Sequence, residues 1–90
     1  MPCLRVVIRG RVQGVGFRYF ALSQARSLSL KGWVRNRPDG SVELEAEGEQ
    51  GDLERLIERL RRGPTGARVD AVDEAWSAKL KQFKSFDIMD

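Results

Sequence analysis

The spacing of apolar residues changes several times along the chain, and the order of these changes constrains the fold more than any other feature. In some segments apolar side chains alternate with other side chains, which is the period of a half-buried strand. In others they recur every three or four residues, the period of a helix with one buried face. The periods follow one another as strand, helix, strand, strand, helix and strand, so we expect both kinds of element in one core.

The first 40 residues contain the first two strands, a glycine loop and the first helix. Alternation over residues 3–9 predicts a strand with one face on the core. Residues 10–16 hold three glycines in seven positions and predict a loop with unusual backbone angles. Apolar spacing then predicts a helix over about residues 17–29. We expect Gly32 to end the connection and residues 33–37 to form a short strand.

A hairpin is predicted in the middle of the chain. Pro38-Asp39-Gly40 is a turn signal, because Pro presets its own φ and Gly accepts positive φ. The second arm alternates strictly until Gly48, which predicts one buried face and one acidic face exposed to water. The apolar positions are Val42, Leu44 and Ala46, and the acidic positions are Glu43, Glu45 and Glu47.

A second helix is predicted over residues 52–62. Four apolar residues form one stripe along it, with Arg and Glu on the other face as intrahelical pairs. The stripe consists of Leu53, Leu56, Ile57 and Leu60. Gly63-Pro64 ends this helix.

The last part of the chain predicts two strands. Residues 67–79 form one strand, although its alternation slips between Ala71 and Val72, and Phe86 with Ile88 indicate a short final edge strand. The complete order is that of the split β-α-β unit. It predicts an α+β, ferredoxin-like sandwich, an antiparallel sheet with two helices on one face, as a single domain over residues 1–90.

Length and composition exclude several classes of protein. Ninety residues suffice for one domain with one small core. Apolar runs such as Val6-Val7-Ile8 are far shorter than the roughly 18 residues of a membrane helix. The amino terminus has no basic start followed by the apolar stretch of a secretory signal. We therefore expect a cytoplasmic protein that has no membrane partner.

Missing residue types also exclude several chemistries. The chain has no His and a single Cys, Cys3, which we expect to be a small buried apolar residue. Ser-His-Asp and Cys-His nucleophiles are thereby excluded, as are zinc sites of the Cys/His kind. Any catalysis must use Arg, Lys, Asn, carboxylates or the backbone.

The glycine loop is a candidate anion site. Residues 1–40 carry eight Arg/Lys and one Asp, a net +7, whereas residues 41–90 carry a net −4. A glycine loop that enters a helix can turn its amides and the helix dipole toward an anion. Arg18, in the first helical turn, can add a planar fork that matches phosphate oxygens. Alternatively, the glycines serve only a tight connection and Arg18 is a solvated surface cation.

Asn36 also has two interpretations. Just before a Pro-Asp-Gly turn, an Asn often forms local turn hydrogen bonds. If strands 3–9 and 33–37 are sheet neighbours, however, Asn36 could lie beside the start of the glycine loop. Trp33 and Trp76 are interpreted as packing residues rather than as a base-stacking platform.

Two long motifs carry a resemblance when they are read together. GRVQGVGFR at residues 10–18 and GWVRNRPDGSVELEAEG at 32–48 resemble the acylphosphatase family, and the resemblance covers nearly the whole chain. It implies a hydrolase that cleaves small-molecule acyl phosphates to a carboxylate and inorganic phosphate, without cofactor or metal. We expect this protein to be a monomer. The resemblance also implies that Arg18 binds phosphate and that Asn36 orients the attacking water. The implied phosphate-binding residues are Gln13, Gly14, Val15, Gly16, Phe17 and Arg18.

The available residue types suit that chemistry. Phosphoryl transfer needs mainly positioning and stabilisation of charge on the equatorial oxygens, which backbone amides and one Arg supply. A carboxylate leaving group, whose parent acid has a pKa of about 4, departs without a proton donor at neutral pH. A neutral amide can hold a water but cannot be its base. The proton then leaves through the substrate phosphate or after the transition state, and both routes stay open.

Two alternatives remain. The same fold carries RNA-recognition domains, but these need aromatic residues on the central strands, and no Gly-Phe-Gly-Phe run occurs here. We therefore expect no nucleic-acid partner. The second alternative is a piece of a larger enzyme, because acylphosphatase-like domains also occur fused in hydrogenase-maturation carbamoyltransferases. The end of the chain at residue 90 favours a standalone protein. Its last residues, FDIMD, resemble the family less clearly than the motifs do.

Overall fold

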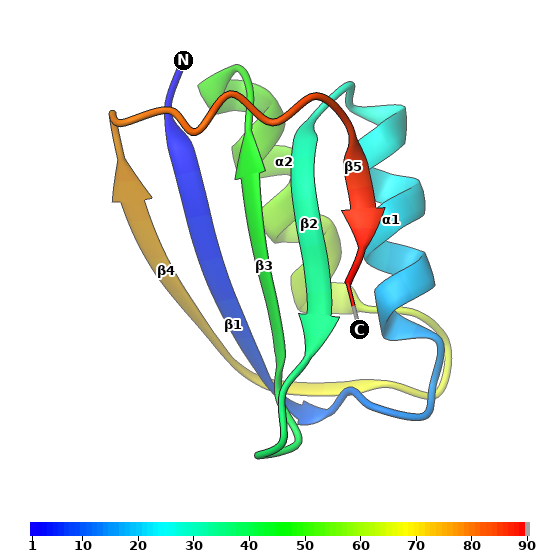
Figure 1. The fold of residues 1–90 in the computed structure, drawn as a ribbon. Coiled ribbons are helices and arrows are strands. Elements are labelled where there is room, and N and C mark those ends of the chain that lie inside the picture. The colour runs from blue at the N-terminus through cyan, green and yellow to red at the C-terminus, as the bar shows by residue number, and fades with distance from the viewer. Residues whose placement is uncertain (90) are drawn as a thin grey trace.

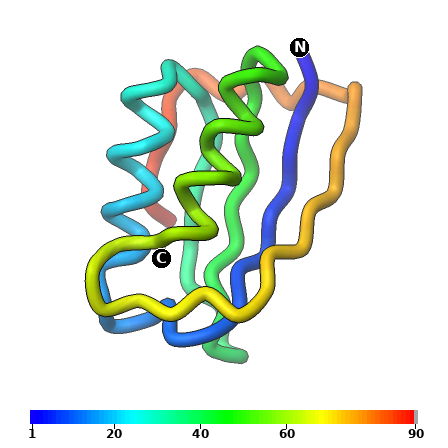
Figure 2. The backbone as a smooth tube through the Cα atoms, turned by 180° about the vertical axis from the view of Figure 1, so that it is seen from behind, coloured from blue at the N-terminus to red at the C-terminus, as the bar shows by residue number. Residues whose placement is uncertain are grey.

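Two helices pack on one face of a five-stranded sheet in the computed structural model, which describes residues 1–89 (Figure 1). In chain order the elements are β1 (Cys3–Arg11), α1 (Phe17–Ser27), β2 (Lys31–Asn36), β3 (Val42–Glu47), α2 (Gln50–Arg62), β4 (Arg68–Ser77) and β5 (Phe86–Ile88). Seen from behind, α1 and α2 lie side by side across the sheet (Figure 2). The predicted ferredoxin-like α+β fold is confirmed. Asp90, the last residue of the predicted domain, lies outside the described residues.

The strands lie in the order β4-β1-β3-β2-β5, and the four longer ones are antiparallel, as predicted. The predicted edge strand at Phe86 and Ile88 is also confirmed, but it adds to the sheet parallel to β2. Its direction follows from the connection before it. Residues 78–85 carry the chain from the end of β4 across to the opposite edge, so β5 must run in the direction of β2 (Figure 1).

The core lies between the sheet and the two helices. The predicted apolar stripe of α2 is buried there, as is Phe17, which fixes the first turn of α1. Full burial of a large apolar side chain contributes about 1.5–3 kcal/mol, so these side chains hold the helices on the sheet. The sheet contributes Leu4, Val6, Ile8, Val34, Val42, Leu44 and Ala46.

Both predicted helices are present. α1 ends at Ser27 instead of about residue 29, because Ser29 takes a φ of 58°, outside the helical region. α2 begins two residues before the predicted start and ends at Arg62 as predicted. Neither of these helices in residues 1–89 is long and apolar enough to cross a membrane.

The acidic face of β3 is not exposed, so this prediction was wrong. Glu43, Glu45 and Glu47 are only 1%, 8% and 6% exposed. At the end of β3, the backbone N–H groups of residues 81–83, in the segment between β4 and β5, donate hydrogen bonds to Glu47. Alternation identified the two faces of the strand correctly. It carries no information on a segment, far along the sequence, that crosses the outer face.

Glu43 is covered in a different way, by two arginines from the neighbouring strands. Arg5 on β1 donates to Glu43 over 2.7 Å from its Nε, and Arg35 on β2 donates over 2.8 Å from its Nε. Burial raises the pKa of Glu43, but the hydrogen bonds from Arg35 and Arg5 outweigh it, so the pKa lies below its ordinary value. The ionised carboxylate therefore links three strands on the outer face.

A bulge in β4 explains the slip in its alternation. Arg9 pairs with Ala71 and Gly10 pairs with Val69, which leaves Asp70 as an extra residue. The irregularity lies slightly before the predicted position. Gly10 permits a close approach here, since a Cβ on it would lie 2.2 Å from the Arg68 carbonyl oxygen.

Candidate active site

The glycine loop has the unusual backbone that its sequence predicts. β1 extends to Arg11, so the loop itself spans residues 12–16. Gly14 and Gly16 have φ values of 75° and 76°, in the left-handed region that disfavours other residues. A Cβ at either position would meet nothing within 4 Å. These glycines are therefore required by backbone conformation, and not by lack of space.

The start of α1 is open to an anion. Gly16 is its N-cap and forms no side-chain cap hydrogen bond, and the first turn has no acidic residue. The Phe20 N–H donates to the Gly16 carbonyl over 3.0 Å. The N–H groups of the residues before Phe20 precede the first intrahelical bond, so they are free to donate hydrogen bonds to an anion.

Arg18 lies in this first turn and is half-buried. No carboxylate of residues 1–89 lies within 4.0 Å of its guanidinium nitrogens. By contrast, Arg9 and Arg37 both lie within 4.0 Å of Asp39. The positive charge of Arg18 is thus uncompensated beside the open end of α1.

Asn36 is the last residue of β2 and lies at the same end of the sheet. It is two residues from the fully buried Val34, so its side chain points to the face that carries the helices. The register aligns Asn36 with Val42 and Val42 with Ile8. β1 and β2 are therefore not direct neighbours, as the favourable interpretation of Asn36 required, because β3 lies between them.

The glycine loop nevertheless approaches β2 by another route. The loop leaves β1 and enters α1, which packs over β2. The start of α1 and the end of β2 lie at the same end of the sheet (Figures 1 and 2). The Oδ1 of Asn36 is buried and has no hydrogen-bond partner among the described residues. Buried polar atoms are rarely left unsatisfied, so this oxygen is suited to a water or a substrate group.

Gln13 connects the loop to the hairpin turn, which the sequence did not indicate. Its Nε2 donates to the carbonyl of Arg37 over 2.8 Å and to that of Ser41 over 2.9 Å. The family resemblance implies that Gln13 is one of the phosphate-binding residues, and it implies no role for the side chain. Ser41, at 2% exposed, was not identified at all, because a Ser after a Pro-Asp-Gly turn is ordinary turn composition.

Asp39, in the hairpin turn, is strongly acidic. The hydroxyl and then the backbone N–H of Ser41 are the main causes, and they lower its pKa to about 2. Glu43, on the outer face, also has a lowered pKa. Both carboxyls are therefore ionised at neutral pH, and neither holds a proton to donate.

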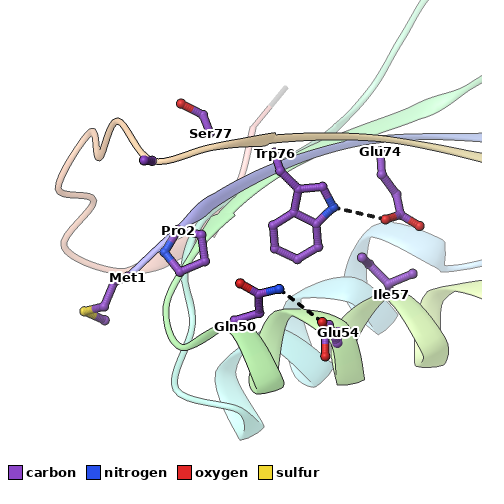
Figure 3. A pocket seen from close by; sticks show the side chains of 9 residues that line it. Met1, Pro2, Gln50, Glu54, Ile57, Glu74, Trp76 and Ser77 are labelled. Carbon is purple, nitrogen blue, oxygen red and sulfur yellow. Dashed lines mark hydrogen bonds between the residues drawn. The ribbon is translucent and has the colours of Figure 1, made fainter.

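A cavity of about 680 Å³ lies at the opposite end of the sheet from the glycine loop (Figure 3). Its walls include Pro2 before β1, Ser77 at the end of β4, and Gln50 at the start of α2. The side chain of Trp76, which is 40% exposed, points into this cavity, and its Nε1 donates a hydrogen bond to Glu74 over 3.2 Å. Trp76 is thus a rim residue, as expected, and takes no part in the candidate site.

Other expectations about single residues concern the outer face. Cys3 is buried at 5% exposed, as predicted. Trp33 is half-buried, and the guanidinium of Arg35 lies 5.5 Å from its ring centroid.

Within residues 1–89, no group of three or more His, Cys, Asp or Glu side chains is arranged to hold a metal ion.

The chain is similar to members of one known family over nearly its whole length. A family model described as Acylphosphatase matches residues 4–88. A relative from Salinibacter ruber named Acylphosphatase is 54% identical over 81 residues, 90% of this chain and 85% of the relative. Another of that name, from Acaryochloris marina, is 49% identical over 87 residues, 97% of this chain and 92% of the relative. The crystal structure of acylphosphatase from Bacillus subtilis matches with a TM-score of 0.98 at 39% identity, covering 99% of each chain.

Proposed function

Since the chain belongs to the acylphosphatase family, whose members are hydrolases of acyl phosphates, we propose that residues 13–18 bind the phosphate group and Asn36 orients the attacking water. One observation carries this proposal above the others. Arg18, with no carboxylate partner among residues 1–89, lies in the first turn of a helix that begins at a left-handed glycine. The Arg18 cation, the free backbone amides and the helix dipole therefore all favour an anion at the start of α1.

Phosphate binding uses charge that is already in position. The left-handed conformations of Gly14 and Gly16 let successive amides converge, and the guanidinium of Arg18 adds two parallel donors. As the bond to the leaving carboxylate breaks, negative charge spreads over the equatorial phosphate oxygens. Donors that are fixed in place stabilise this charge without reorganising, and one such donor is typically worth 10²–10³ in rate.

Asn36 supports the second half of the reaction. Its buried Oδ1 lacks a donor among the described residues, and a water molecule can supply one O–H while its lone pair faces the phosphorus. A carboxamide does not take up a proton at neutral pH, so Asn36 orients this water and is not its base. The proton of the water passes to a phosphate oxygen of the substrate, during attack or after the transition state.

The leaving group requires no acid from the protein. A carboxylic acid has a pKa of about 4, so the carboxylate departs as a stable anion. Asp39 and Glu43 are ionised and have no proton to give, which agrees with this requirement. We propose that Arg18 and the loop amides provide the charge stabilisation and that the reaction proceeds without a metal ion.

An RNA-binding role is not favoured by the sheet surface. RNA-recognition domains of this fold stack bases on aromatic side chains of the central strands. Here the outward positions of the central strands β1 and β3 include Arg5, Val7, Glu43 and Glu45, and none is aromatic. The only aromatic residue of β2, Trp33, is already covered by Arg35.

The test of the proposed function is a continuous assay of benzoyl phosphate hydrolysis by the purified chain in the presence of EDTA. We expect benzoate and inorganic phosphate in equal amounts, at a rate that EDTA does not change. Hydrolysis no faster than the spontaneous reaction would contradict the proposed function. Activity that EDTA abolishes and a divalent cation restores would contradict the metal-independent mechanism.

A further inference from the structure

We propose that Gln13 is a positioning residue, whose side-chain amide holds the glycine loop at a fixed distance from Asn36. The inference rests on the proposed function, since it assumes that phosphate binds to the loop and that Asn36 holds the water. It assigns to the side chain of Gln13 a role in turnover that is separate from phosphate binding.

The contacts of Gln13 bridge two segments that are far apart in the sequence. Its Nε2 donates to the carbonyl of Arg37, which directly follows Asn36, over 2.8 Å. It donates as well to the carbonyl of Ser41 over 2.9 Å, on the other side of the hairpin turn. A carboxamide nitrogen has two hydrogens, so both are used in this bridge.

The two accepting carbonyls are themselves part of the turn. The Arg37 N–H donates to the Ser41 carbonyl over 2.8 Å, and the Gly40 N–H donates to the Arg37 carbonyl over 3.1 Å. Each carbonyl thus accepts one hydrogen bond within the turn and one from Gln13. The side-chain amide therefore donates to two acceptors that the turn itself holds in place. Residue 13 can then donate to phosphate only through its backbone N–H.

Val12 anchors the start of the loop in the core, and the hydrogen bonds between the loop and the turn come from Gln13. Strand pairing of β1 ends at Arg11, and the next element, α1, begins at Phe17. Within residues 1–89, the two bonds of Gln13 are the hydrogen bonds that join residues 12–16 to the turn after Asn36. A misplacement of about 1 Å between reacting groups can cost on the order of 10² in rate, so this link can control turnover.

The first test compares Gln13→Met, which keeps the length of the side chain but removes its donors, with wild type and with Asn36→Ala. For each protein, kcat with benzoyl phosphate and the inhibition constant of inorganic phosphate are measured. We expect Gln13→Met to lower kcat roughly tenfold or more, by loss of alignment. Inhibition by phosphate should stay within about threefold of wild type, because the loop amides and Arg18 remain.

The double variant separates positioning from the other possible roles. If Gln13 acts through Asn36, Gln13→Met should lower kcat less than about twofold once Asn36 is already Ala. Equal losses in both backgrounds, or a weakening of phosphate inhibition equal to the loss in kcat, would overturn the inference in favour of direct phosphate binding. An unchanged kcat in the folded variant would leave Gln13 a purely structural role and would also overturn it.

Gln13→Glu provides a second test if the Met variant does not fold. An ionised carboxylate faces the two carbonyls without a donor, whereas a protonated carboxyl regains one. The kcat of Gln13→Glu relative to wild type should therefore rise as the pH falls from 7 to 5, and a flat ratio would contradict the bridge. Gln50→Met, the same change at the opposite end of the sheet, is the control and should not alter kcat. An inactive wild-type chain would instead refute the proposed function itself.

Discussion

Ser41 donates two hydrogen bonds to the same oxygen of Asp39, one from its hydroxyl over 2.5 Å and one from its backbone N–H over 3.0 Å. Together they are the main reason that the pKa of Asp39 falls to about 2. Asp39 belongs to the turn that follows Asn36. Because its pKa is this low, its carboxyl is ionised at every pH at which the protein is expected to work. Asp39 therefore has no proton to donate to a leaving group at neutral pH.

The first prediction is that only substrates with stable anionic leaving groups are hydrolysed. An alkyl phosphate needs protonation of its leaving alkoxide, and a positioned acid typically contributes 10²–10⁴ in rate. Rates over a series of substituted benzoyl and aryl phosphates should therefore follow the pKa of the leaving group. Glycerol phosphate should show no turnover above background, and the rate should have no inflection near pH 6.5, where a histidine would titrate. Efficient, EDTA-insensitive hydrolysis of an alkyl phosphate would mean that a carboxyl donates a proton after all.

The second prediction concerns the charge of Arg18. Arg18→Ala should fold but lose at least about 10²-fold in kcat/KM, because one principal donor to the equatorial oxygens is removed. Arg18→Lys should recover little of this loss, since an ammonium lacks the planar fork. Arg55→Ala removes an exposed arginine of α2 that pairs with Asp52, and serves as the matched control. Retention of more than about a tenth of wild-type activity in Arg18→Ala would return Arg18 to the role of a solvated surface cation.

The third prediction concerns the left-handed glycines. Gly14→Val and Gly16→Val should weaken inhibition by inorganic phosphate at least about tenfold, because a β-branched residue strongly disfavours positive φ and the amides would turn away. Gly66→Val is the control, since Gly66 has a φ of 90° and equally open surroundings. Gly48 would be a poor control, because a Cβ at this position would lie 2.4 Å from the Leu30 side chain and would disturb the packing. Equal inhibition of all three variants and wild type would contradict the amide site.

The fourth prediction concerns stability and pH. The pKa of Glu43 is lower in the folded protein than its ordinary value, so its contribution is present above that value and is lost as the pH falls through the folded pKa. Glu43→Gln should lower the free energy of unfolding at pH 7 by on the order of 1–3 kcal/mol, and by less at pH 3. Urea unfolding at the two pH values measures this, with the exposed Glu58→Gln as control. A loss of the same size at both pH values would show that the charge of Glu43 does not matter.

The sequence predicted the elements of the fold better than their surroundings. The periods of Leu53 to Leu60 and of Val42 to Ala46 identified one helix and one strand face correctly, because local packing determines both. The burial of Glu47 could not be predicted in this way. It depends on a segment that begins after β4 and returns across the sheet, which no local pattern near Glu47 encodes.

The same distinction applies to the site. The φ values of Gly14 and Gly16 follow from their residue type and position, and the loop was identified for that reason. The bridge from Gln13 to Arg37 was not foreseen, because a glutamine can bond to any nearby carbonyl and its partner is set by tertiary structure. The sequence suggested that Asn36 lies near the glycine loop if its strand pairs with the first strand. The structure places β3 between these two strands.

We propose that Arg18 binds phosphate and that Asn36 positions the water. The most direct test of these separate roles is one paired measurement on Asn36→Ala. Its kcat with benzoyl phosphate and its inhibition constant for inorganic phosphate are determined beside those of wild type. We predict that turnover falls by at least about 10²-fold, through loss of water positioning, while phosphate still inhibits competitively at a similar concentration. Loss of phosphate affinity in proportion to kcat would show that Asn36 only maintains the turn, and would contradict its role in positioning water.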